Sequence, residues 1–252
     1  MEIKTFFDNI SCTFTYLLFD SDASEAIIID PVLINNSLPV QVTNFIDKES
    51  LSLKYIFETH IHADHLSAAF ELKNKYSTAK VCIHEDIKIV IDNFKNLTTS
   101  IAQFDIKFKD GDLFDFGNLK LKVLHTPGHT PTCSSFLVAD KLFVGDTIFM
   151  PDFGTGRCDF PSGSAKTLYE SIQKIYKLRD ETIIYVGHDY APNGREYNSK
   201  TSVKESKEKN IHIDTKTSAK EFVDFRNKRD KTLAPPKILN QAIKYNLTGL
   251  NE

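Results

Sequence analysis

The sequence predicts a layered α/β fold, and three observations support this prediction. Short segments rich in β-branched and aromatic residues alternate with segments of helical hydrophobic spacing. Polar clusters directly follow several of the predicted strands. Apolar residues make up 41% of the 252 residues, which is enough for a sizeable core. Because compact α/β folds of this length often form one unit, we expect a single domain over residues 1–252.

Charge, hydropathy and cysteine content exclude several functional classes. The formal net charge is only −3, with basic and acidic side chains spread along the chain, so we expect no nucleic-acid partner and no membrane partner. No apolar run approaches the roughly 20 residues that span a bilayer. The N-terminus shows no signal-peptide pattern. The four cysteines form no CxxC pair, so we expect free thiols and a cytoplasmic location.

The first third of the chain is predicted to be rich in strands. Residues 12–19 and 25–30 form two strands around a polar turn, and residues 40–48 follow as a helix. Residues 54–58 form a further strand, and residues 63–76 have the spacing of a helix. These elements alternate as the strands and helices of a layered fold do.

Hairpins and one long helix are predicted for the middle of the chain. Turn sequences within 105–125 and 134–144 separate short apolar runs, which favours hairpins in both segments. In order, the predicted elements are a strand at 80–84, hairpin strands in 105–125 with turns at 110–112 and 117–118, a hairpin in 134–144, a helix at 164–178 capped by Ser164, and a strand at 182–186.

The last fifty residues are more helical and more charged than the rest. Helices are predicted at 201–210, 218–230 and 237–245. We therefore expect a core of about residues 1–200 followed by a helical C-terminal extension over about residues 201–252.

Polar clusters follow the predicted strands at four places, namely 59–65, 126–130, 145–147 and 187–190. In layered α/β folds such strand ends converge at one edge, where binding sites are normally found. Five of the eight histidines fall in these clusters, together with three aspartates. They are His60, His62, His65, His129 and His188, with Asp64, Asp146 and Asp189. We expect His84 and His212, which lie outside the clusters, not to be ligands.

This donor set predicts a metal site. Imidazole together with carboxylate suits zinc, iron or manganese. In an extended segment, residues two apart point the same way, so His60 and His62 can reach one ion. Asp64 and His65 then turn toward a neighbouring position.

The motifs resemble those of the metallo-β-lactamase superfamily. Residues 59–65 match its THxHxDH signature, and residues 126–130, 145–147 and 187–189 match its later metal motifs in the same order. The resemblance covers nearly the whole chain and implies a four-layer αββα sandwich. It is less specific for the reaction, because this fold hosts thioester, lactam and nucleic-acid hydrolases as well as oxidoreductases.

Finer features resemble the persulfide dioxygenase branch. They are Ala63 within the signature, Cys133 after His129, the segment 154–160, His188-Asp189-Tyr190, and Glu221-Phe222-Val223. Residues 150–155 and 209–212 are similar to the bacterial β-lactamase-like hydrolase proteins of sulfide detoxification. Two positions depart from the branch, since Thr132 stands where Gly is usual and Cys158 where Thr is common.

This resemblance implies one Fe(2+) per chain, held by His62, His129 and Asp146. Such a two-histidine, one-carboxylate set leaves three coordination positions open. The implied reaction oxidises glutathione persulfide, or a related low-molecular-weight persulfide, with O2 to sulfite and thiol. By the same analogy a homodimer is expected.

The resemblance also implies supporting roles. His60, Asp64, His65 and His188 would orient the ligands and relay protons, or hold a second metal. Arg157 would bind a glutathione carboxylate through its planar fork. Tyr190 would line the same pocket.

Two other functions remain open at this stage. In a hydrolase of the glyoxalase II type, His60, His62 and His129 would hold one Zn(2+), and Asp64, His65 and His188 a second. Asp146 would bridge the two ions, and a bridging hydroxide would attack a thioester. The other alternative is a non-catalytic persulfide sensor that kept the site.

Overall fold

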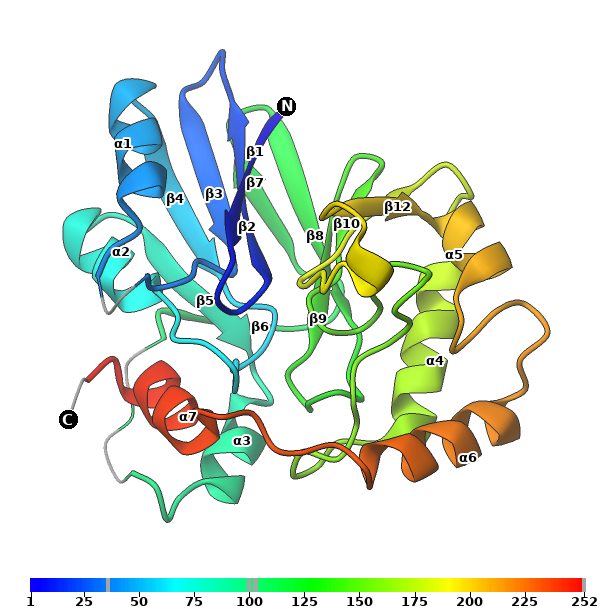
Figure 1. The fold of residues 1–252 in the computed structure, drawn as a ribbon. Coiled ribbons are helices and arrows are strands. Elements are labelled where there is room, and N and C mark those ends of the chain that lie inside the picture. The colour runs from blue at the N-terminus through cyan, green and yellow to red at the C-terminus, as the bar shows by residue number, and fades with distance from the viewer. Residues whose placement is uncertain (35–36, 99–100, 102–103, 251–252) are drawn as a thin grey trace.

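Two six-stranded sheets face each other at the centre of the computed structural model, which describes residues 1–34, 37–98, 101 and 104–250 (Figure 1). The first sheet has the order β1 (Glu2–Asp8), β2 (Thr13–Asp20), β3 (Glu25–Ile29), β4 (Ser52–Phe57), β5 (Lys80–His84) and β6 (Ile106–Phe108). The second has the order β12 (Lys200–Ser202), β11 (Ile183–Tyr185), β10 (Lys141–Phe143), β9 (Ser134–Val138), β8 (Leu119–His125) and β7 (Leu113–Phe116). The predicted αββα sandwich is confirmed.

Helices cover the outer faces of both sheets (Figure 1). On the side of the first sheet lie α1 (Val40–Lys48), α2 (Ala69–Lys75), α3 (Ile87–Asn93) and α7 (Leu239–Thr248). On the side of the second lie α4 (Ala165–Tyr176), α5 (Val203–Lys209) and α6 (Ala219–Asp230). Ser164 caps α4 by accepting a hydrogen bond from the Thr167 amide at 3.2 Å, as the sequence predicts.

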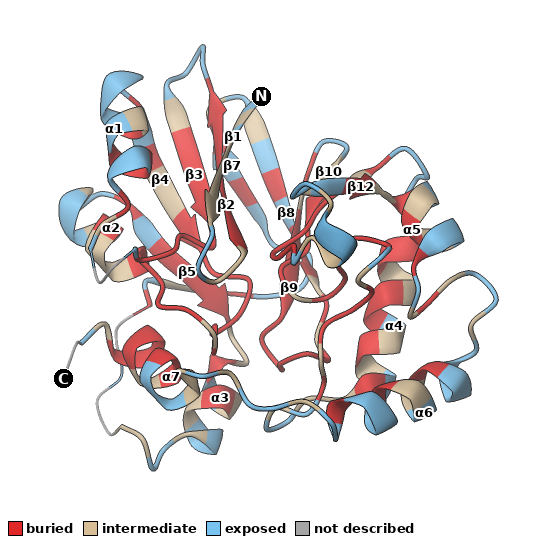
Figure 2. Cartoon of the chain, in the orientation of Figure 1, coloured by how far each residue is buried: buried red, intermediate tan, exposed pale blue. Residues whose placement is uncertain are grey.

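Strand direction changes within each sheet. In the first sheet the pairs β1–β2 and β2–β3 are antiparallel, whereas β3 to β6 are mutually parallel. The parallel strands have apolar residues on both faces because the other sheet covers one face and helices the other. Figure 2 shows this as buried strand interiors between helices whose outer faces are exposed.

Apolar side chains form two layers of core. Between the sheets, aromatic rings from both interdigitate, with Phe57 lying 5.0 Å from the ring centres of Phe114 and Phe136. The other layer lies between the first sheet and its helices, and α7 contributes Ala242, Tyr245 and Leu247 to it. The predicted C-terminal extension is therefore packed into the fold, and α6 likewise buries Phe222 against the central core.

The helix predicted over residues 63–76 is wrong at its start. Residues 63–68 are not helical, and α2 begins only at Ala69. Residues 63–68 keep an irregular path because the Ser67 amide and the His65 carbonyl, like the His62 carbonyl just before them, bond to a distant side chain instead of to a helical turn. The apolar residues at helical spacing there serve a loop that packs on the core.

The turn at 110–112 does not form a hairpin. It joins β6 of the first sheet to β7 of the second, so the chain changes layer there. The hairpins predicted around 117–118 and 139–141 are confirmed by the antiparallel pairs β7–β8 and β9–β10. Strands β1 and β12 and helix α3 are additional to the prediction, and because β12 takes the start of the helix predicted at 201–210, α5 begins at Val203. Within the described part of the chain, every helix is too short or too polar to cross a membrane.

Candidate metal centre

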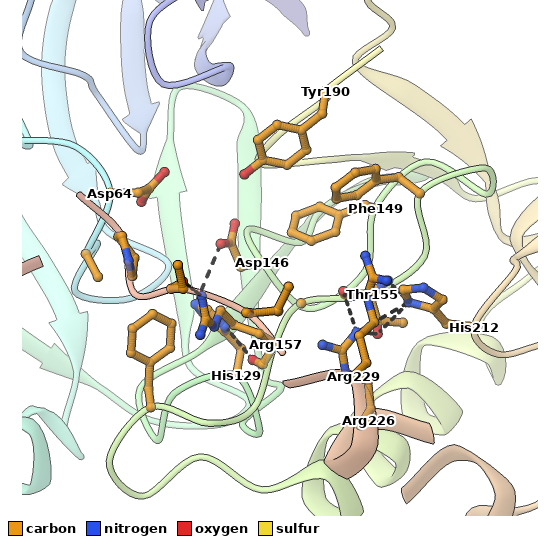
Figure 3. A pocket seen from close by; sticks show the side chains of 17 residues that line it. Asp64, His129, Asp146, Phe149, Thr155, Arg157, Tyr190, His212, Arg226 and Arg229 are labelled. Atoms are coloured by element: carbon orange, nitrogen blue, oxygen red, sulfur yellow. Dashed lines mark hydrogen bonds and ion pairs between the residues drawn. The ribbon is translucent and has the colours of Figure 1, made fainter. Parts of the chain in front are cut away.

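The polar clusters after β4, β8, β10 and β11 meet at one edge of the sandwich, as predicted. Asp146 lies at the meeting point, with one carboxylate oxygen facing His129 and the other facing His188. Figure 3 shows His129, Asp146 and Asp64 at one end of a pocket.

The donor atoms of His60, His129 and Asp146 lie within 4.8 Å of one another, and both histidines are buried. Asp146 Oδ2 is 4.0 Å from His60 Nε2 and 3.6 Å from His129 Nε2. The two rings are held from behind by their Nδ1 atoms. His129 Nδ1 donates to the carbonyl of Arg157 at 2.7 Å, and His60 Nδ1 lies 3.0 Å from Thr59 Oγ1.

These contacts fix the tautomers. Thr59 Oγ1 donates its own proton to Asp30 at 2.8 Å, so it accepts from His60 Nδ1. Each ring therefore carries its proton on Nδ1 and turns the lone pair of Nε2 toward Asp146. Burial lowers the pKa of His60 and of His129, which keeps both rings neutral. Neutral imidazole is the form that binds a metal ion.

His62 does not join this group. Its ring lies beside that of His60, with 4.1 Å between centroids, but its Nε2 lies 3.2 Å from Asp30 Oδ1 and 3.1 Å from Glu58 Oε2. Burial opposes a charge on His62, yet the two carboxylates outweigh burial and raise its pKa well above the usual value. His62 Nε2 thus faces Asp30 and Glu58, and it is His60, not the predicted ligand His62, that lies with His129 and Asp146 in the structure.

A second group of donors lies on the other side of Asp146. His188 Nε2 is 3.3 Å from Asp146 Oδ1 and 3.5 Å from Asp64 Oδ2. His65 Nδ1 is 3.3 Å from Asp64 Oδ1. Burial disfavours a charged His188, but Asp146 and Asp64 together raise its pKa. The structure thus brings together the residues predicted to support the ligands or to hold a second metal.

Unpaired buried atoms show that the cluster fits a cation. Among the described residues, the buried polar atoms without a hydrogen-bond partner include His65 Nε2, Asp146 Oδ1 and His188 Nε2. Buried polar atoms are nearly always paired, so a cluster of unpaired nitrogen and oxygen atoms needs an explanation. A metal ion bound among nitrogen and oxygen donors would satisfy them.

Asp189 has a structural role instead. Its carboxylate binds the Arg195 guanidinium at 2.5 and 2.7 Å and accepts from the Asn198 amide at 2.7 Å. Two other carboxylates, those of Asp30 and Glu58, contact His62 beside the centre. The sequence analysis did not single them out. Both directly follow a strand, so the reasoning applied to the other strand ends would have found them.

The pocket beside the centre has a volume of about 300 Å³. One end contains the metal-binding candidates, and the other contains Thr155, His212, Arg226 and Arg229 (Figure 3). Its walls are largely aromatic and include Phe149, Phe153, Phe160 and Tyr190. Tyr190 lines the pocket as predicted and stacks near His188, with 5.7 Å between ring centroids.

Arg157 lines this pocket, but its fork is already occupied. Nε and Nη2 bind the two oxygens of Asp159 at 2.6 and 2.7 Å, and Nη1 donates to the Ala234 carbonyl at 2.8 Å. This pairing argues against the predicted contact with a substrate carboxylate. The contribution of Arg157 to the centre comes from its main-chain carbonyl, which orients His129.

Outside the centre, His84 and His125 stack at 3.7 Å between centroids beside Asp86. Two of the nitrogens near Asp86 are taken, since His84 Nδ1 accepts from the Asp86 amide and His125 Nε2 lies 2.9 Å from the Pro131 carbonyl. In-plane lone pairs of stacked rings also run parallel and do not converge on one ion. The donor atoms of His84, His125 and Asp86 nevertheless lie within 4.8 Å of one another, so the prediction that His84 is not a ligand stays a prediction.

His84 gives a prediction for acid stability. Burial, followed by the neighbouring His125, lowers the pKa of His84 to about 4. An unfolded histidine binds a proton near pH 6.5, so between about pH 6.5 and 4 the unfolded chain holds more protons at this position. Acidification through that window should therefore lower the free energy of unfolding. Urea titrations at pH 7 and 4.5 should show a smaller loss for His84→Asn; an equal loss would contradict this account.

Comparison with known proteins identifies the family. The Metallo-beta-lactamase superfamily profile matches residues 13–188, which include every residue of the two donor groups. The chain belongs to the metallo-beta-lactamase superfamily. The solved structure of ETHE1 from Myxococcus xanthus, itself of this fold, aligns with a TM-score of 0.82 and 32% identity over 98% of each chain.

Curated relatives within the superfamily carry different names. Glyoxylase B2 of Dictyostelium discoideum is 40% identical over 98% of this chain and 90% of its own length. A beta-lactamase hydrolase-like protein of Xylella fastidiosa is 39% identical over 98% of this chain, which spans 60% of that relative. The mitochondrial persulfide dioxygenase ETHE1 of Homo sapiens is 37% identical over 75% of this chain and 68% of its own length. The predicted resemblance to the persulfide dioxygenases is thereby confirmed.

Proposed function

We propose that this protein is a non-haem iron dioxygenase that oxidises a low-molecular-weight persulfide. The observation that carries the proposal is the group of His60, His129 and Asp146 with two neutral Nε2 atoms and one carboxylate facing a common point. Two histidines and one carboxylate, with further positions open toward a pocket, are typical of non-haem Fe(II) oxygenases. The similarity to the human and Myxococcus proteins supports the same reaction class.

The proposed reaction converts a persulfide RSSH, O2 and water into the thiol RSH and sulfite. The outer sulfur loses four electrons and gains three oxygen atoms, while O2 accepts the four electrons and the S–S bond breaks. When bound, a ferrous ion supplies the electron transfer that O2 activation requires. The chain holds His60 and His129 neutral, keeps the Asp146 carboxylate beside both, and lines the adjoining pocket with aromatic side chains.

An anionic end of the substrate would meet Arg229. Two of the arginines lining the pocket are neutralised, Arg157 by Asp159 and Arg226 by Asp230. Arg229 lines the same end, and no carboxylate lies within ion-pair distance of it in the described part of the chain. A glutathione carboxylate would provide that missing charge.

Replacing Arg229 with Gln should therefore raise the KM for glutathione persulfide about 10- to 100-fold, which corresponds to one lost charged contact, with little change in kcat. Steady-state oxygen uptake measures both constants. Lys228→Gln removes an exposed charge of the same helix outside the pocket and serves as the control. An unchanged KM in Arg229→Gln would remove this residue from the substrate site.

A dinuclear thioester hydrolase is the second candidate. Asp146 turns Oδ2 toward His60 and His129 and Oδ1 toward His188, which is the arrangement of a bridging carboxylate. Asp64 and His65 complete a second donor group beside it. With two Zn(2+) ions, a bridging hydroxide would attack the carbonyl of a glutathione thioester.

One comparison separates the two functions. Protein purified without oxygen should contain about one iron per chain and consume O2 when glutathione persulfide is added. The same sample should cleave S-lactoylglutathione no faster than the Asp146→Ala variant does. Two zinc ions per chain with rapid thioester cleavage and no O2 uptake would support the hydrolase.

A further inference from the structure

The last helix reaches the metal centre through one side chain. Asn246 of α7 is only 4% exposed and lies some 180 residues from the segment that it contacts. Its Oδ1 accepts from the Ser67 amide at 2.7 Å, and its Nδ2 donates to the carbonyls of His62 at 2.9 Å and His65 at 3.0 Å. Both protons of the amide and its oxygen are used, all on residues 62–67.

This segment carries Asp64 and His65 and has no helix or strand of its own. Its backbone must therefore be held by other parts of the fold. Ser67 extends the contact, because its hydroxyl donates to Glu58, the carboxylate that faces His62. A chain of contacts thus runs from α7 to the residues behind the centre.

The helix also packs on the outer core through Ala242, Tyr245 and Leu247, and the Tyr245 hydroxyl donates to Glu71. Burying an amide in such an interface is unfavourable unless every polar atom is paired. Asn246 meets this condition, because its side chain pairs with the carbonyls of His62 and His65 and with the Ser67 amide.

We propose that Asn246 is a positioning residue of the metal centre, so that α7 completes a site whose donors all lie before residue 189. The proposal rests on the proposed metal site and not on which reaction occurs there. It also extends the site beyond residues 13–188, the part that matches the superfamily profile.

Metal binding tests this proposal directly. Asn246→Asp preserves the shape of the side chain but replaces two donors with an acceptor that repels the carbonyls of His62 and His65. We expect about 10- to 100-fold weaker binding of Zn(2+) to metal-free protein, measured by competition with a chelator, as for other residues that orient ligands. The rise in Tm on adding Zn(2+) should shrink accordingly. Asn240→Asp, on the exposed face of α7, should match the wild type.

Hydrogen exchange gives a second readout. In the wild type the Ser67 amide is bonded to Asn246, so it should exchange slowly, and Asn246→Ser should speed its exchange while leaving the strand amides of β4 protected. Asn246→Ser removes the side-chain amide without adding charge. It is the variant for the zinc-binding test if Asn246→Asp does not fold.

Unchanged zinc affinity, with Tm lowered equally in metal-free and metal-loaded protein, would show that Asn246 only docks the helix and would overturn the proposal. A second outcome separates this inference from the proposed reaction. If Asn246→Asp loses zinc affinity while the iron-loaded wild type shows no O2 uptake with any persulfide, the inference stands and the proposed reaction does not.

Discussion

Replacing Asp146 with Ala is expected to strip the metal from the protein and to abolish O2 uptake. The two oxygens of this carboxylate face His60, His129 and His188, so Asp146 contacts both donor groups. Its loss would leave an excess of imidazoles around the ion without the negative charge that offsets the cation. Since replacing residues that merely orient ligands costs 10- to 100-fold in affinity, removing this ligand should cost at least about 100-fold.

Metal analysis and an oxygen electrode measure the outcome. Asp115→Ala is the matched control, because Asp115 is an exposed aspartate of β7 paired with a surface lysine. The control should keep wild-type iron content and activity. Retained iron and oxygen uptake in Asp146→Ala would refute the assignment of this carboxylate as a ligand.

Replacing Gly156 with Ala should have the next largest effect, although it adds only one methyl group. A Cβ at this position would lie 2.0 Å from the Asp146 carbonyl oxygen and 3.4 Å from His129 Cβ. The Asp146 carbonyl belongs to the main chain and cannot swing away as a flexible side chain would, so the segment around Gly156 must move away from the residues that carry the ligands Asp146 and His129. We expect a loss of about 1–3 kcal/mol in the free energy of unfolding, as for overpacking elsewhere, together with low iron content.

Thermal unfolding and metal analysis of the purified variant test this expectation. Gly111→Ala provides the contrast, since no atom lies within 4 Å of its added Cβ and only the positive φ opposes it. That variant should lose some stability but bind metal normally. Wild-type stability and iron content in Gly156→Ala would show that the loops are not packed as closely as the structure indicates.

The location of the centre is predictable from sequence because it follows from topology. Strands that end in polar residues, such as those before His60, His129 and His188, meet at one edge once the sheets form. The hairpins at 117–118 and 139–141 are predictable for a different reason, because the residues that form each turn lie next to one another in the sequence.

Which of His60 and His62 faces the metal site depends on tertiary contacts that the spacing of the two histidines does not reveal. Both histidines of an HxH pair point the same way, but Asp30 and Glu58 lie beneath His62 and hold its Nε2. Asp30 comes from another strand, so only the folded arrangement shows that His62 faces the carboxylates. Arg157 is a similar case, because Asp159 occupies its fork.

The irregular path of residues 63–68 was also beyond the sequence pattern. Leu66, Ala69 and Leu72 have helical spacing, yet the segment before Ala69 bonds to Asn246 from the far end of the chain. Such a long-range hydrogen bond overrides local propensity, as tertiary contacts commonly do.

The ratio of O2 consumed to sulfite formed tests the proposed function most directly. With glutathione persulfide as substrate and iron-loaded protein, the account predicts that one O2 is consumed for each sulfite produced. The Asp146→Ala variant should consume no O2 and form no sulfite. The account is contradicted if iron-loaded, folded protein forms no sulfite and consumes no O2 while it releases glutathione from S-lactoylglutathione.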